Sequence, residues 1–201
     1  MSKTLKFMKY TVALKSTTKP EWVSAVKADF NAFLQNHADC ERKASGMAQN
    51  FIAKYPDRLE ILDELMAISI EELEHFRQVY KFMELRGVYL PQKMEKDAYI
   101  NTLIQNSRTG RDERFMDRIL MAGIIEARGS ERFITIGEAL EDEVLSKYYI
   151  QLGRAEAKHI HSFIKMCSYY FDDDVIYKRL EELLILEAKI IDSLPFEAKL
   201  Y

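Results

Sequence analysis

Two Glu-x-x-His motifs are the residues of this chain best suited to chemistry. Glu72 lies three residues before His75, and Glu156 lies three residues before His159. On a helix, residues three apart project from one face about one turn apart. The carboxylate and the imidazole of each motif can therefore reach one metal ion together. The two copies predict two equivalent metal-binding helices, 84 residues apart in the sequence.

Each motif is preceded by a further glutamate at nearly the same spacing. Glu41 lies 31 residues before Glu72, and Glu126 lies 30 residues before Glu156. This interval lets one helix end, turn and return antiparallel. Two such hairpins facing each other would bring four glutamates and two histidines into a core, a ligand set typical of di-iron or di-manganese carboxylate sites in ferritin-like four-helix bundles. The predicted metal ligands, which would be catalytic through the metal centre, are Glu41, Glu72, His75, Glu126, Glu156 and His159.

The residue three positions before each predicted ligand glutamate is small. These residues are Ala38, Ser69, Gly123 and Gly153, and Gly129 follows Glu126 at the same distance. Glycine inside a helix costs about 1 kcal/mol relative to alanine, so these glycines need a reason. Room for metal ions, dioxygen or a substrate is one reason. The alternative is close packing of helices whose glutamates lie on the surface, which leaves the duplicated motif unexplained.

The donor set also indicates which metal would bind. Carboxylates combined with imidazoles suit iron or manganese better than zinc, and a pure calcium site would use no histidine. We therefore expect two iron ions, with manganese possible, whose charge offsets the cost of clustering carboxylates in a core. His37 lies one turn before Glu41 and is a further ligand, a polar neighbour of the ligands or a packing residue. Glu131 is expected to be a surface charge.

Long helices must position these residues. The chain has only seven glycines and four prolines, mostly between periodic segments, which predicts an all-α fold. We expect a ferritin-like four-helix bundle with a crossover helix and an extra C-terminal helix. Thr18 with Glu21 forms a capping-box pattern, Asp57 could cap the second helix, and Gly87 could end it. The predicted helices cover about 18–55, 57–86, 92–106, 111–140, 142–171 and 174–193, in a single domain over residues 1–201 with an N-terminal arm at 1–17.

Composition excludes several classes of protein. The net charge of −3 excludes a uniformly basic nucleic-acid binder, although the first 20 residues hold five lysines and no acid. Two cysteines without a C-x-x-C motif exclude a zinc ribbon, a rubredoxin-type iron site and a disulfide scaffold, and favour a cytoplasmic protein. No apolar run reaches the length of a signal peptide or a membrane span, so no membrane association is expected.

Three stretches resemble one known family. Residues 37–44, 71–76 and 124–133, and above all the phrase Glu-Ala-Arg-x-x-Glu-Arg-Phe that begins at Glu126, are similar to the tRNA 2-methylthio-N6-isopentenyladenosine hydroxylase family. The resemblance covers nearly the whole chain. It implies a ferritin-like fold and a non-haem di-iron centre held by the same six ligands. It also implies a reaction that inserts one oxygen atom from dioxygen into the isopentenyl group of the modified adenosine at tRNA position 37.

The expected partners follow from the same reading. No nucleotide-binding fingerprint is present, so the two electrons would come from a separate reductase or ferredoxin. The anticodon loop of tRNA could contact the N-terminal arm, through Lys3, Lys6 and Lys9, or the start of the third bundle helix, through Arg108, Arg111, Arg114 and Arg118. Interleaved acids, Asp112, Glu113 and Asp117, make a salt-bridged solvated face an equal alternative there.

The alternative function is that of a ferritin-like ferroxidase or iron-handling protein. Such a protein would assemble into a large symmetric cage, whereas we expect a monomer or a small homo-oligomer. A rubrerythrin-like peroxidase is disfavoured by the missing cysteine motif. A non-enzymatic helical binding module is disfavoured because all six ligand positions are occupied by ligand residues.

Overall fold

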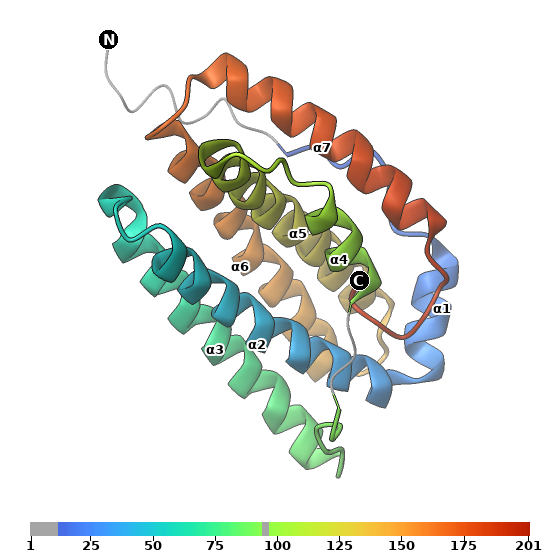
Figure 1. Cartoon of the computed structure of the whole chain (residues 1–201). Coiled ribbons are helices and arrows are strands. Elements are labelled where there is room, and N and C mark those ends of the chain that lie inside the picture. The colour runs from blue at the N-terminus through green and yellow to red at the C-terminus, as the bar shows by residue number, and fades with distance from the viewer. Residues whose placement is uncertain (1–11, 94–96) are drawn as a thin grey trace. The chain divides into compact units, whose positions relative to one another are not determined.

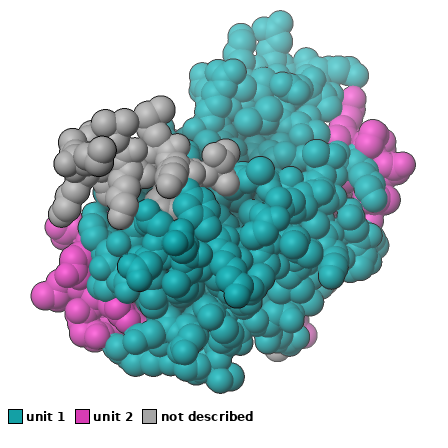
Figure 2. Space-filling view, turned by 90° about the horizontal axis from the view of Figure 1, so that it is seen from above, with its two compact units in different colours: residues 1–19, 97–195, 201 teal, residues 20–96, 196–200 magenta. Residues whose placement is uncertain are grey.

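The computed structural model describes residues 12–93 and 97–201, which form helices and no strands (Figure 1). The chain divides into two compact units, coloured separately in Figure 2. Unit 1 consists of residues 1–19, 97–195 and 201, and unit 2 of residues 20–96 and 196–200. The single domain expected over residues 1–201 stays a prediction. Lys3, Lys6 and Lys9 of the expected arm lie outside the described residues.

Unit 2 is built around a helical hairpin. Its elements are α1 (Pro20–Ala28), α2 (Phe30–Lys54), the short 3-10 helix η3 (Leu59–Ile61) and α3 (Leu62–Leu85). Helices α2 and α3 pack along their length, and each buries one apolar face. Gly87 has a positive φ of 65°, which a glycine adopts without steric cost, and so ends α3 as predicted.

The helix predicted over 18–55 is wrong because it is interrupted at Asp29. The Asp29 carboxylate accepts the backbone N–H of Ala32 and so starts α2 as a new helix. Thr18 is not a cap, because its amide and hydroxyl donate to Glu131. The next helix begins at η3 instead of Asp57, and no side chain caps η3 or α3.

Unit 1 contains the second long hairpin and two further helices. These are α4 (Ala98–Gln105), α5 (Arg111–Ala139), α6 (Glu143–Ser168) and α7 (Asp173–Ser193). Helices α5 and α6 form the most extensive packing in the chain, and α7 packs against α4, α5 and α6. The crossover helix is shorter than the predicted 92–106, because Asp97 accepts the N–H of Ile100 and starts the helix there. Asp142 likewise caps α6.

Two global expectations can be compared with the described part of the chain. None of its helices has a stretch long and apolar enough to cross a bilayer. Cys40 and Cys167 are both free thiols.

Candidate metal centre

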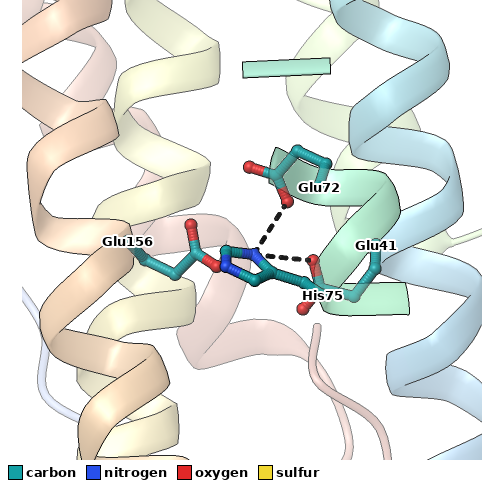
Figure 3. Close-up of side chains that lie close together, drawn as sticks. All are labelled: Glu41, Glu72, His75 and Glu156. Atoms are coloured by element: carbon teal, nitrogen blue, oxygen red, sulfur yellow. Dashed lines mark ion pairs between the residues drawn. The ribbon is translucent and has the colours of Figure 1, made fainter. Parts of the chain in front are cut away.

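Unit 2 brings three of the predicted ligands together. Glu41 comes from α2, Glu72 and His75 come from α3, and all three side chains are buried. One ligand atom from each lies within 4.8 Å of the others. The Nδ1 atom of His75 is 3.6 Å from a Glu72 oxygen and 3.9 Å from a Glu41 oxygen, the two ion pairs drawn in Figure 3. We call these three residues the α2–α3 half-site.

Unit 1 brings the other three together in the same way. Glu126 lies on α5, Glu156 and His159 lie on α6, and all are buried. One ligand atom from each lies within 4.8 Å of the others. The Nδ1 atom of His159 is 2.9 Å from an oxygen of Glu156. These residues form the α5–α6 half-site.

A serine hydroxyl sets the register of both hairpins, a device that the sequence interpretation missed. Ser45 lies four residues after Glu41 and donates to the carbonyl oxygen of Ser69 at 2.8 Å. Ser130 lies four residues after Glu126 and donates to the carbonyl oxygen of Gly153 at 2.6 Å. Both acceptors lie three residues before the motif glutamate of the facing helix. The duplication therefore extends from the ligand types to the contact that aligns them.

The glycines of unit 1 serve close packing of helices. A Cβ atom on Gly153 would lie 2.8 Å from the Ser130 carbonyl oxygen and 2.7 Å from an Ile134 side-chain carbon. A Cβ atom on Gly129 would meet the Tyr201 hydroxyl at 2.7 Å, and one on Gly123 would make an ordinary contact with Phe163 at 3.5 Å. Of the two reasons offered by the sequence, the structure favours packing over open space at Gly153.

His37 is hydrogen-bonded to the carboxylate of Glu41, one of the predicted ligands. Its Nε2 lies 2.6 Å from an oxygen of Glu41, and the ring is fully buried. Burial, with a smaller contribution from His75, lowers the pKa of His37 to about 3. The ring is therefore neutral at pH 7, and since a neutral imidazole bonds a carboxylate through its N–H, Nε2 is the donor. Of its three predicted roles, this geometry favours that of a polar neighbour that orients Glu41.

Helix α5 is anchored by a buried arginine two residues after Glu126. Arg128 and Glu187 are both 0% exposed, and two guanidinium nitrogens of Arg128 bond the Glu187 carboxylate at 2.8 and 3.1 Å. Arg128 also donates to the Ser16 carbonyl and to Glu131. Glu131 accepts from Thr18 as well, so this charge, expected at the surface, is partly exposed and also takes part in hydrogen bonds. It closes a network that joins residues 16–18, α5 and α7.

Each half-site fits a metal ion by the chemistry of its donors. Two glutamates and one histidine, all buried, supply carboxylate oxygens and an imidazole nitrogen at mutual distances suited to one coordination sphere. The neutral His37 adds no positive charge to offset Glu41 and Glu72. A cation bound between these carboxylates would offset the cost of burying them.

Comparisons with known proteins bear on what such a chain does. The family model described as tRNA-(MS[2]IO[6]A)-hydroxylase (MiaE) matches residues 6–201. A tRNA 2-(methylsulfanyl)-N(6)-isopentenyladenosine(37) hydroxylase of Pseudomonas putida is 31% identical over 176 residues, which cover 88% of this chain and 85% of that protein. The protein of the same name from Salmonella typhimurium is 29% identical over 117 residues, 58% of this chain and 42% of its own length.

A solved structure carries the fold comparison. A Synechococcus protein with aldehyde deformylating oxygenase activity superposes with a TM-score of 0.87 at 32% identity, over 92% of both chains. Its ferritin-like fold confirms the predicted all-α, ferritin-like class. The family model spans nearly the whole chain, and the Pseudomonas relative matches most of both sequences. This chain therefore belongs to the tRNA hydroxylase family that the MiaE model describes.

Proposed function

We propose that this chain hydroxylates the isopentenyl group of 2-methylthio-N6-isopentenyladenosine at position 37 of tRNA. The observation that carries the proposal is the family match over residues 6–201 in a chain whose two half-sites each bury two carboxylates and one histidine. A core packed from aromatic and aliphatic side chains alone would not require this duplicated set of buried glutamates and histidines. The reaction would take place in the cytoplasm, where tRNA is available.

We propose that the two half-sites together hold two iron ions. Glu41, Glu72 and His75 would supply one half of the coordination and Glu126, Glu156 and His159 the other. The matched serine contacts support this arrangement, because they give both hairpins the same register relative to their ligands. Such a centre, when loaded, supplies activation of dioxygen. His37 would keep the Glu41 carboxylate oriented through its Nε2–H.

The proposed reaction requires a separate electron donor. Conversion of a C–H bond to C–OH by dioxygen consumes two electrons and two protons, and the second oxygen atom leaves as water. No nucleotide-binding fingerprint occurs in the sequence, so a reductase or a ferredoxin would deliver the electrons. The modified base stands in a single-stranded loop, where it needs little unstacking before it enters a site.

Nucleoside mass spectrometry tests this function directly. Bulk tRNA from cells that lack the protein should contain the isopentenyl nucleoside and no hydroxylated form, and expression of the parent chain should restore the form that is heavier by one oxygen atom. A Glu72→Gln, Glu156→Gln variant is the matched control, because it keeps side-chain volume and removes one predicted ligand charge from each half-site. Absence of the hydroxylated nucleoside with the iron-loaded parent chain would refute the proposal.

The Synechococcus structure supports a second candidate, an oxygenase that removes the formyl group of an aldehyde. Its identity of 32% is similar to that of the Pseudomonas hydroxylase. Formate release from an aldehyde, with the same electron donor, separates the two candidates. We expect no formate above a metal-free control. Formate release together with unmodified tRNA would favour the second candidate.

A further inference from the structure

The outer face of α6 carries basic side chains and no acids. Arg154, Lys158 and His161 are exposed and Lys165 is partly exposed, at successive intervals of four, three and four residues. This spacing places them on one side of the helix, and we call them the α6 basic face. Between residues 144 and 168 the single acid is Glu156, which is buried. Four basic side chains thus follow one another over about 16 Å of helix, at 1.5 Å per residue.

The charges at the centre of this face are not compensated within the described residues. Neither Arg154 nor Lys158 has an ion-pair partner in residues 12–93 and 97–201, whereas other exposed cations do, such as Arg77 with Glu74 and Lys15 with Glu181. Arg154 and Lys158 are also a like-charge pair four residues apart, which disfavours the helix that holds them. In a chain with a net charge of −3, such a face is suited to an anionic partner.

The position of the face relates it to the proposed site. The same helix carries Glu156 and His159, which are buried on its other side. At 3.6 residues per turn, Lys158 and Lys165 project roughly opposite to Glu156. A polyanion held on the outer face would therefore lie roughly one helix diameter, about 10 Å, from the ligand-bearing face. This proximity suits a substrate whose reacting group is a small part of a large molecule rich in phosphates.

Part of the surface that the sequence indicated is compensated by acids. Arg108 donates through its side chain and its backbone N–H to the buried Asp117, which also accepts from Arg179. Arg111 lies 4.0 Å from Asp112. The interleaved acids thus engage arginines. For Arg108, the alternative of a salt-bridged face is therefore the correct one. The start of α5 is therefore a weaker phosphate surface than the α6 basic face.

We propose that the α6 basic face binds the phosphate backbone of the RNA substrate. This inference rests on the proposed function, which makes tRNA the substrate. Neutralising phosphates releases condensed counterions. The logarithm of the binding constant therefore falls linearly with the logarithm of the salt concentration, with a slope of about 0.7 to 0.9 for each phosphate contact. Three contacts through Arg154, Lys158 and Lys165 would account for a slope of about two to three units.

A charge-reversal triple variant, Arg154→Glu, Lys158→Glu, Lys165→Glu, tests the face. The probe is fluorescently labelled tRNA purified from cells that lack this protein, titrated by anisotropy at several salt concentrations. We expect binding to weaken at least 10-fold at low salt and the salt slope to fall by about two to three units. The matched control is Lys54→Glu, Lys81→Glu, Lys178→Glu, which changes the net charge equally at exposed lysines on α2, α3 and α7. It should bind tRNA much more tightly than the α6 variant.

Iron content and thermal unfolding show whether both triple variants fold. If the α6 triple variant does not fold, the milder Arg154→Gln, Lys158→Gln variant replaces it. Equal losses in both triple variants, or parent-like binding by the α6 variant, would overturn the proposal. If the parent chain modifies tRNA while the α6 variant binds tRNA normally, only the assignment of the α6 basic face is refuted. If the parent chain neither binds nor modifies tRNA, the proposed function itself is refuted. Normal tRNA binding with slowed reduction by an acidic ferredoxin would reassign the face to the electron donor.

Discussion

The α2–α3 and α5–α6 half-sites share ligand types and a serine contact, yet their supports differ. In unit 2, His37 lies four residues before Glu41 and bonds its carboxylate. The corresponding residue before Glu126 is Ala122, which offers no hydrogen bond. In unit 1, Arg128 lies two residues after Glu126 and pairs with Glu187 of α7, whereas Lys43 in the corresponding position pairs with Asp39 of its own helix. One half-site is thus supported by a polar neighbour of its ligand, the other by an additional helix.

This difference shows that a duplicated ligand pattern does not require a duplicated scaffold. The ligand geometry depends on two helices in each unit, and the serine hydroxyl aligns both pairs. What holds each pair in place can then differ. The two hairpins also differ where α6 approaches α5 at Gly153. The other hairpin has Ser69 at the corresponding position.

The largest effect should come from removing a histidine ligand from either half-site. His75→Ala and His159→Ala should each lower the iron content from about two ions per chain to about one, because each removes a donor with no substitute. Losing an outer-shell partner of a metal typically costs 10–100-fold, and loss of a ligand should exceed that in hydroxylation rate. Metal analysis of the purified variants checks this. Two tightly bound irons in the His75→Ala, His159→Ala double variant would disprove the ligand assignment.

Breaking the buried ion pair should destabilise the chain strongly. Arg128→Met leaves Glu187 buried and uncompensated, which should cost about 3–5 kcal/mol in free energy of unfolding. The double variant Arg128→Met, Glu187→Leu should recover much of that loss, since neither charge remains. Lys43→Met, at the equivalent position of unit 2, should cost less than 1 kcal/mol because Lys43 is partly exposed. Denaturant unfolding measures all three, and equal losses for Arg128→Met and Lys43→Met would remove the asymmetry.

Removal of His37 should make the two half-sites more alike. His37→Ala takes away the Nε2–H that bonds Glu41 and should weaken iron binding about 10–100-fold at one of the two sites. Competition with a chelator measures this affinity. Ala122→His is the converse change in unit 1, and Ala122→Ser is its small control. Unchanged affinity in His37→Ala would mean that Glu41 is held by other contacts.

Two glycines should respond to alanine in opposite directions. Gly153→Ala places a methyl group within 2.8 Å of a backbone oxygen and should cost about 1–3 kcal/mol. Gly46→Ala, on the exposed side of α2 with nothing within 4 Å, should stabilise by about 0.4–1 kcal/mol. Thermal unfolding of the two variants gives the comparison. A stabilised Gly153→Ala would show that α5 and α6 can separate at little cost.

Local patterns in the sequence predict much of the fold. The periodic segments after Gly110 correspond closely to α5, α6 and α7, because helical periodicity and Asp142 as a cap act within a few residues. The break at Asp29 was missed because apolar residues continue the helical spacing on both sides of it. The ferritin-like class and the family were also accessible from the spacing of the motifs and the phrase beginning at Glu126.

The sequence by itself predicted the side chains proposed to bind metal, because the Glu-x-x-His spacing is a property of a single helix turn. The tertiary structure decided how those helices are held. Arg128 and Glu187 are 59 residues apart, and Glu131 meets Thr18 across 113 residues, separations at which no periodic pattern predicts a contact. Ser130 and the Gly153 carbonyl are joined only once the hairpin has formed. Such bonds depend on where packing brings distant segments, since burial makes an uncompensated charge or polar group too costly to leave unmatched.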